Sequence, residues 1–284
     1  MQLCALDLNE RLTFAREARK HQDYFCLECH RSVRLRKGLH RQPHYYHTSP
    51  NRECRQDGKG MAHLVTQYFI RDLLPDGEAH LEHRFQSINR VADVAWLPQK
   101  LIFEIQYSPI TAKEVESRNK DYASLGYQVV WILFDGRYNQ KRISSAEDVL
   151  KDSPYYFTNM TDGGEGIIYD QLAIVESGKR VDSLPKLEID ISCPEYIKEK
   201  LPKLLWRQIK IGALYFKGDC IYNYLQYTQS INQTDFHITF SRLIASQNHS
   251  KPTSLSQTIY SYFQSWIVVP YHAVLRLLVE RASQ

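Results

Sequence analysis

Residues 91–106 read VADVAWLPQKLIFEIQ, and this stretch decides the fold that the sequence predicts. Two apolar runs, VADVAW and LIFEIQ, flank a short polar link, which is the pattern of two adjoining strands. Each run carries one acid among apolar neighbours, Asp93 in the first and Glu104 in the second. Because side chains alternate along a strand, Glu104 and Gln106 point to the same face. We therefore expect the two acids to converge on one side of a sheet.

The residues on either side extend this pattern to an α/β domain. Apolar residues recur at helical spacing from 61 to 73, and Pro75 then ends the predicted helix. Strands are predicted for 79–85 and 128–134, with a helix over 111–125 between them. The continuous apolar run at 128–134 is typical of a central strand that helices cover on both faces.

The two acids in these strands predict a metal site. A buried acid is costly unless it is paired or binds a cation. Mg²⁺ prefers oxygen ligands and often uses one or two carboxylates together with water and phosphate oxygens. Asp93 and Glu104 are therefore predicted magnesium ligands and catalytic residues, because a bound metal ion can activate water for attack on a phosphodiester. Gln106 can orient that water; the alternative is that both acids are ion-paired structural residues.

Two helices supply further candidates. His63 and Gln67 are four residues apart on one helix face, so both can approach the acids. We predict a supporting catalytic role for His63, although a structural role is an equal alternative. Arg118 can hold a DNA phosphate, or it can pair with Glu114 one turn earlier on its helix.

A second metal site is predicted before these elements. The C-x-x-C pair Cys26 and Cys29 can place two thiolates on one tetrahedral ion, and zinc is the metal such a site usually binds. His47 and Cys54 are the preferred remaining ligands, with His44 as the alternative to His47. Since the two histidines are three residues apart, they face opposite sides of an extended strand, and one of them binds. The other interpretations are buried thiols, or a redox pair that lacks a βαβ context.

The same N-terminal stretch is basic. Residues 11–59 contain twelve Lys and Arg against five Asp and Glu, whereas the 284-residue chain has a formal net charge of only +4. Such an excess favours contact with DNA phosphates, and Arg34, Arg36 and Lys37 are the predicted contacts. The alternative is a solvated basic face. The stretch is predicted to be β-rich apart from a helix over 13–21, and its low apolar content leaves its stability to a structural metal.

The chain divides into three predicted parts: a zinc-binding basic module over 1–58, an α/β domain over 59–150, and a mainly helical C-terminal region over 151–284. The composition, 43% hydrophobic and 24% charged, is that of a globular protein. The longest apolar runs are far shorter than the roughly 20 residues of a membrane helix. No secretion signal is apparent at Met1, so we expect a cytoplasmic protein without a membrane segment.

The motifs occur in an order that resembles the CoiA-like competence proteins of Gram-positive bacteria. The matching runs are FCLEC at 25–29, PHYYH at 43–47, ADV at 92–94, FEIQYSPI at 103–110, Arg118 and WIL at 131–133. The resemblance implies a restriction-endonuclease-like core of the PD-(D/E)XK type, with Gln106 where such enzymes usually place lysine. It also implies a role in natural transformation and DNA recombination, alongside a RecA-type recombinase.

The predicted function is accordingly a Mg²⁺-dependent deoxyribonuclease that acts on incoming, single-stranded DNA. One departure bears on activity: the family often has Ser-x-Glu-His where this chain has Gly60-Met61-Ala62-His63, so the expected glutamate is missing. The alternative function is therefore a catalytically inactive DNA-binding or recombinase-accessory factor. A transcription regulator is the weakest hypothesis, because no convincing recognition helix is present.

Overall fold

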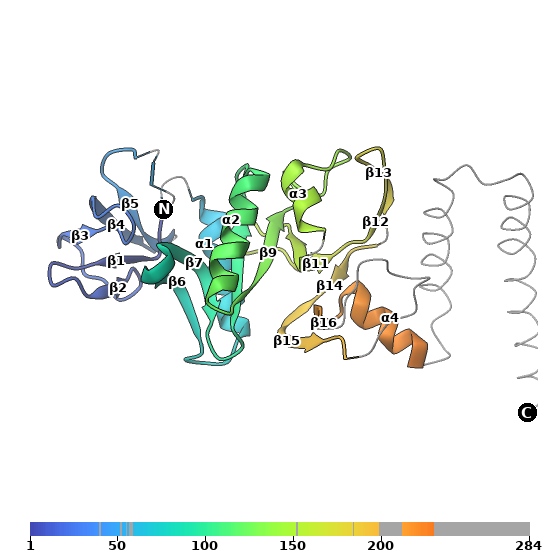
Figure 1. Ribbon diagram of the computed structural model, residues 1–284. Helices are drawn as coiled ribbons and strands as arrows, with labels where there is room; N and C mark the ends of the chain where they lie inside the picture. The colour runs from blue at the N-terminus through green and yellow to red at the C-terminus, as the bar shows by residue number, and fades with distance from the viewer. Residues whose placement is uncertain are drawn as a thin grey trace, which may run out of the picture. The chain divides into compact units, whose positions relative to one another are not determined.

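The computed structural model (Figure 1) describes residues 1–39, 41–51, 53, 54, 56, 59–151, 153–183, 185–198 and 212–229. Met1–Gln171 and Lys186–Asn223 form one compact unit. The described residues between 172 and 185 and between 224 and 229 belong to a second unit. Every candidate site residue lies in the first unit.

Five antiparallel strands form the N-terminal sheet, in the order β2-β1-β3-β4-β5. They are β1 (Cys4–Leu6), β2 (Leu12–Phe14), β3 (Tyr24–Phe25), β4 (Ser32–Gly38) and β5 (Arg41–His47). The β-rich character of this module is thus confirmed, but the helix predicted over 13–21 is wrong. Leu12–Phe14 pairs with Cys4–Leu6, and turns follow it. A helix this short is marginal on its own, so strand pairing overrides the local preference.

A mixed seven-stranded sheet forms the centre of the first unit, in the order β14-β11-β10-β9-β8-β7-β6. Its strands are β6 (Ala79–Phe85), β7 (Arg90–Trp96), β8 (Leu101–Gln106), β9 (Gln128–Phe134), β10 (Tyr155–Thr158), β11 (Ile168–Asp170) and β14 (Leu187–Glu188). β9 pairs in parallel with β8 and β10, and the other described pairs are antiparallel. The strands predicted around the two acids are confirmed, and the sheet continues past residue 150.

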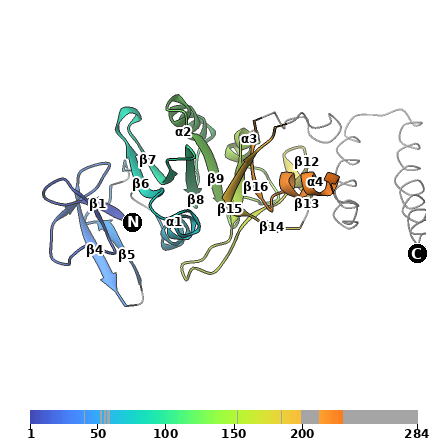
Figure 2. The same ribbon diagram turned by 90° about the horizontal axis from the view of Figure 1, so that it is seen from below.

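Helices cover both faces of this sheet, as Figure 2 shows for α1 and α2. The helical segments are α1 (Met61–Leu73), the 3-10 turn η1 (Gln86–Ile88), α2 (Ala112–Ser124) and α3 (Ser145–Leu150). Along β9, Val130 and Ile132 enter the core that contains Leu64 of α1, whereas Trp131 enters the core that contains Val115 of α2. This alternation confirms β9 as a central strand covered on both sides.

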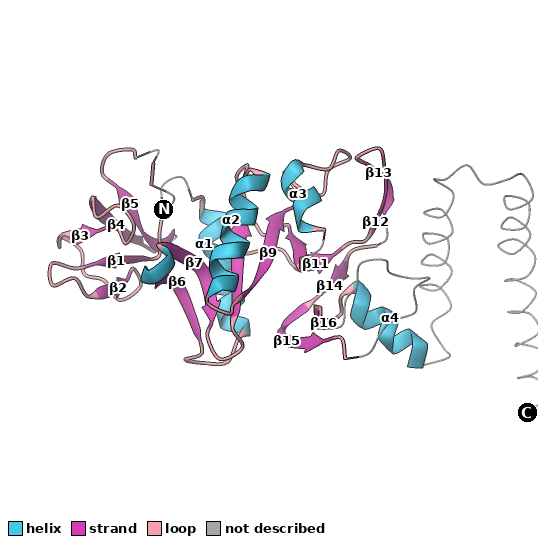
Figure 3. Cartoon of the chain, viewed as in Figure 1, coloured by secondary structure: helices cyan, strands magenta, loops and turns pink. Residues whose placement is uncertain are grey.

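The region after residue 150 differs from the mainly helical prediction (Figure 3). Besides β10, β11 and β14, it contains the hairpin β12 (Ala173–Glu176) and β13 (Lys179–Ser183) and the pair β15 (Asp190–Tyr196) and β16 (Leu214–Lys217). One longer helix, α4 (Cys220–Gln229), follows. The described residues of 155–198 and 214–217 thus form strands and loops instead of the predicted helices, because β10, β11 and β14 extend the central sheet and the other strands pair with one another. Residues 199–211 and 230–284 lie outside the described residues. None of the described helices is long and apolar enough to cross a membrane.

Candidate metal centre and active site

The four predicted zinc ligands come together at one edge of the N-terminal sheet. Cys26 and Cys29 lie in the turn after β3, His47 ends β5, and Cys54 follows in the next turn. Their ligand atoms all lie within 4.8 Å of one another. Cys26 Sγ is 3.6 Å from Cys54 Sγ, and Cys29 Sγ is 3.3 Å from His47 Nε2. A tetrahedral ion with bonds of about 2.0–2.3 Å needs ligand separations of this size, so the cluster is consistent with structural zinc.

The alternative ligand His44 is outside this cluster. Its ring Nδ1 lies 2.8 Å from the carbonyl oxygen of Gln42, and the side chain is buried. His44 pairs with Arg36 and His47 with Val33 across the β4–β5 ladder. Three residues along a strand reverse the side-chain direction, which is why only His47 reaches the thiols.

The hydrophobic core beside the cluster is small. Its buried members are Ala5, Ala15, Ala18, Tyr24, Cys26, Val33, Tyr45 and Cys54, of which two are themselves candidate ligands. Burial and the neighbouring Cys26 raise the pKa of Cys54, so a thiolate there needs a bound cation. Both observations fit a closed, structural zinc site.

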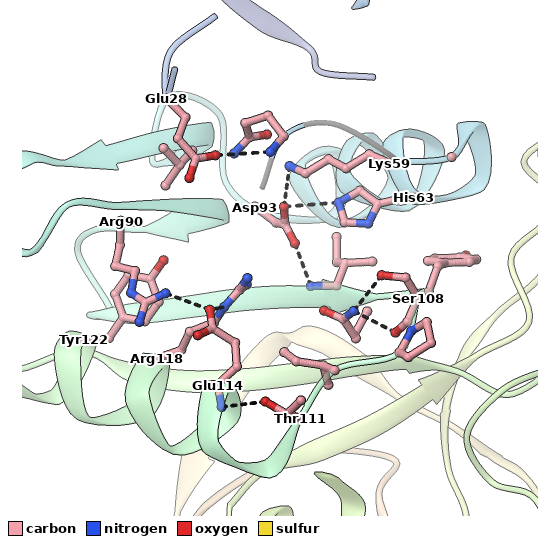
Figure 4. A pocket seen from close by; sticks show the side chains of 18 residues that line it. Glu28, Lys59, His63, Arg90, Asp93, Ser108, Thr111, Glu114, Arg118 and Tyr122 are labelled. Atoms are coloured by element: carbon pink, nitrogen blue, oxygen red, sulfur yellow. Dashed lines mark hydrogen bonds and ion pairs between the residues drawn. The ribbon is translucent and has the colours of Figure 1, made fainter. Parts of the chain in front are cut away.

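A cavity of about 610 Å³ lies beside the acids of the central sheet (Figure 4). Strands β7 and β8, the beginnings of α1 and α2, and residues of the N-terminal module all contribute to its lining. Asp93, His63, Gln106 and Arg118 line it. The structure therefore brings four of the predicted site residues to one cavity.

Asp93 is 4% exposed and accepts hydrogen bonds on both carboxylate oxygens. Lys59 Nζ is 2.8 Å and His63 Nε2 3.1 Å from Oδ1, and the backbone N–H of Ile105 donates to Oδ2 at 2.9 Å. Gln67 also donates to Asp93, to Oδ1 at 3.3 Å and to the backbone oxygen at 3.1 Å. Burial opposes ionisation, but Lys59 and His63 hold the pKa of Asp93 well below its usual range. Burial lowers the pKa of His63, so its imidazole is neutral near pH 7.

Glu104 is 1% exposed and lies on β8 opposite Trp131 of β9, whose side chain enters the core beside α2. Tyr122 donates to one carboxylate oxygen at 2.8 Å, and Arg118 forms a short ion pair with the other. Burial raises the pKa of Glu104, and the charge of Asp93 adds to the rise while Arg118 opposes it. Glu104 does not line the cavity, whereas both of its partners do.

Arg118 makes the contact with Glu114 that its sequence position allowed, and it also contacts Glu104. Besides Glu104, it donates through Nε to Glu114 at 2.9 Å. Gln106 donates to the backbone oxygen of Ser108 at 2.8 Å and to its hydroxyl at 3.0 Å. At the start of α1, Gly60 provides no side-chain cap and no acid stands in the first turn, so the glutamate expected there is absent from the site.

Several residues of the site were not predicted from the sequence, among them Lys59, Glu82, Arg90 and Asp121. Glu82 lies on β6, is 1% exposed, and accepts hydrogen bonds from the backbone N–H groups of Leu3 and Cys4 at 2.9 and 2.8 Å. Lys59 Nζ is 3.2 Å from its other oxygen. Glu82 thus joins the N-terminal sheet to the central sheet. The only sequence signal was an acid beside Leu81 in a strand, which is too common to select it.

The acids and cations of the site are ion-paired with one another. Its acids include Glu82, Asp93, Glu104, Glu114 and Asp121, and its cations are Lys59, Arg90 and Arg118. The formal charges of the cavity lining balance, because Glu28, Asp93 and Glu114 stand against the same three cations. Gln67 Oε1, beside Asp93, is a buried acceptor without a hydrogen-bond partner among the described residues. The carboxylate and amide oxygens are the donor type that a divalent cation such as Mg²⁺ prefers.

Comparison with protein-family models identifies both halves of this arrangement. Residues 61–169 match the nuclease-like domain of competence protein CoiA, and residues 9–57 match the N-terminal domain of competence protein CoiA. The chain belongs to the CoiA competence protein family. No curated protein and no solved structure matches it. The four candidate zinc ligands lie in the segment that matches the CoiA N-terminal domain, and both predicted metal-binding acids lie in the segment that matches the nuclease-like domain. Lys59 lies between the two matched segments.

Proposed function

We propose that this CoiA-family chain is a metal-dependent deoxyribonuclease with a core of the PD-(D/E)XK type, and that it processes DNA during natural transformation. The observation that carries the proposal is the pair of buried acids, Asp93 and Glu104, on neighbouring strands of the nuclease-like domain, with Asp93 in the wall of the cavity. Accidental buried charges are uncommon, because each must be compensated.

Asp93 and Glu104 would hold Mg²⁺, which when bound supplies an activated water and stabilises the charge that develops on the phosphate. His63 holds Asp93 in place through its Nε2 contact. Gln106, at the cavity wall, can orient the attacking water once its amide leaves Ser108. Asp93, His63 and Gln106 line the same cavity, and Glu104 lies behind Arg118 and Tyr122 of its wall.

Arg118 has to move for Glu104 to take part, because its guanidinium covers one carboxylate oxygen. A DNA phosphate offers Arg118 an equally good bidentate partner. We infer that substrate binding draws Arg118 onto the phosphate and thereby frees Glu104. Binding of DNA and assembly of the metal site are then coupled, so that Glu104 becomes available to the metal only when a phosphate is bound.

The function is tested with purified, zinc-loaded protein and labelled single- and double-stranded DNA in EDTA, Mg²⁺ or Mn²⁺. We expect cleavage with either divalent ion and none in EDTA, with faster cleavage of single strands. Intact DNA in every lane, together with retained binding, would establish the second candidate, a DNA-binding accessory factor that acts beside a RecA-type recombinase. That candidate is favoured by one observation: both acids already have cationic partners.

Phosphate contacts by the β4–β5 hairpin form a separate prediction. Arg34 and Arg36 are exposed on β4, and Arg36 lies 4.8 Å from the Tyr46 ring centre. Lys37 already has a partner, because its Nζ donates a hydrogen bond to the backbone oxygen of Arg16 at 2.5 Å. We expect Arg34→Ala with Arg36→Ala to reduce the slope of log affinity against log salt by about 1.5, since each lost phosphate contact removes roughly 0.7–0.9.

The measurement is oligonucleotide binding at several salt concentrations. The charge-matched control is Lys141→Ala with Arg142→Ala, two exposed cations after β9. An unchanged slope in the hairpin variant would show that this basic surface is only solvated.

A further inference from the structure

Lys59 is a buried cation at the wall of the cavity. Its side chain is 10% exposed, and its ammonium lies between two carboxylates, 2.8 Å from Asp93 and 3.2 Å from Glu82. Removing an ammonium from water is unfavourable, and these two acids offset that cost. Burial opposes the charge, but the two acids raise the pKa of Lys59, so it stays protonated.

The other two cations that line the cavity form ion pairs with acids of β8 and α2. Arg90 donates to Glu114 and Asp121, each at 2.8 Å, and Arg118 contacts Glu104 and Glu114. Lys59 is the one lysine among the described lining residues. It has three N–H donors, and the described part of the chain offers acceptors for two of them. One donor is therefore available to a ligand in the cavity, beside Asp93.

The N-terminal domain holds Lys59 in this position. Lys59 follows the zinc ligand Cys54 by five residues, and Gln56 lies between them. Glu28, which stands between the ligands Cys26 and Cys29, accepts a hydrogen bond from the Gln56 backbone N–H at 3.1 Å. Glu28, Gln56 and Lys59 all line the cavity. The cavity is consequently incomplete without the N-terminal domain.

We propose that Lys59 binds the phosphate of the DNA backbone next to Asp93, as a positioning residue that lies between the two matched domains and follows the candidate zinc ligands. The inference rests on the proposed function and names the residue that places the reacting phosphate. A phosphate oxygen would accept the third Nζ donor while Asp93 and Glu82 keep the other two. The charge of Lys59 thus holds the acids together before DNA binds and neutralises the phosphate afterwards.

The test compares Lys59→Met, Lys59→Arg and the double variant Lys59→Met with Gln106→Lys. Gln106 lines the same cavity, so a lysine there can return an ammonium to the phosphate. Oligonucleotide affinity is measured against salt with Ca²⁺ in place of Mg²⁺. We expect Lys59→Met to lower the slope of log affinity against log salt by about 0.7–0.9, and Lys59→Arg and the double variant to restore it. Lys151→Met, at an exposed site, is the control and should leave the slope unchanged.

Lys59→Met leaves two buried acids without their cation, so its folding is checked by thermal unfolding and zinc content. If Lys59→Met does not fold, the double variant Lys59→Met with Glu82→Gln takes its place in the test, because this variant leaves one unpaired acid fewer. A folded variant with the wild-type slope overturns the inference. If Lys59→Met lowers the salt slope but even the wild-type protein never cleaves DNA, the Lys59 contact is supported and the nuclease is refuted. If the variant binds and cleaves DNA as the wild type does, the Lys59 contact is refuted and the nuclease is supported.

Discussion

Asp93→Asn is expected to reduce metal-dependent DNA cleavage by on the order of 10²–10³-fold, the loss typical when one group that stabilises transition-state charge is removed. Asn keeps the shape of Asp93 and its oxygen for the Ile105 N–H, but it removes the negative charge that would bind the metal. Glu104→Gln should have a similar effect. Initial cleavage rates over a range of Mn²⁺ concentrations measure both losses.

The same variants must be shown to fold, because both acids are buried. Removing one partner of a buried ion pair altogether costs about 3–5 kcal/mol, which is why amides are preferred to alanine. In Asp93→Asn, Lys59 retains Glu82, and in Glu104→Gln, Arg118 retains Glu114. Asp148→Asn, an exposed acid paired with Lys151, is the matched control. If folded Asp93→Asn cleaves DNA at the wild-type rate, the Asp93 carboxylate has no catalytic role.

Loss of zinc should unfold the N-terminal domain. Structural zinc contributes an apparent binding free energy of about 10–16 kcal/mol in small zinc modules, and this domain has little apolar core to replace it. We expect Cys26→Ser to release the metal and to remove the protection of backbone amides in the β4–β5 ladder from hydrogen exchange. Zinc content by mass spectrometry and amide exchange of residues 1–56 provide the measurement.

The effect should extend to the nuclease-like domain, because Glu82 accepts two backbone N–H groups of the N-terminal sheet and Lys59 follows the zinc ligands. Cys193→Ser is the control, since Cys193 is exposed and outside the cluster. A Cys26→Ser protein that keeps one zinc ion and wild-type amide protection would contradict a structural role for this cluster.

Local spacing was enough to predict much of this protein. The apolar runs around Asp93 and Glu104 predicted the two paired strands that carry these acids, since a period of two is a property of any extended chain. The same argument predicted that only one of His44 and His47 binds, and the structure places the preferred His47 in the cluster. The order of motifs identified the CoiA family. The predicted helix over 13–21 failed because Leu12–Phe14 pairs with the preceding strand Cys4–Leu6, and the local helical pattern carries no information on that competing pairing.

Tertiary structure alone decided how the charges are compensated. Lys59 meets Asp93 across 34 residues and Glu82 across 23, and Arg118 meets Glu104 across 14. No periodic pattern along the chain encodes such pairs, because they depend on which elements pack together and on the energy of burying a charge. Spacing therefore specifies the acids and the zinc ligands, whereas packing selects the cations that neutralise them.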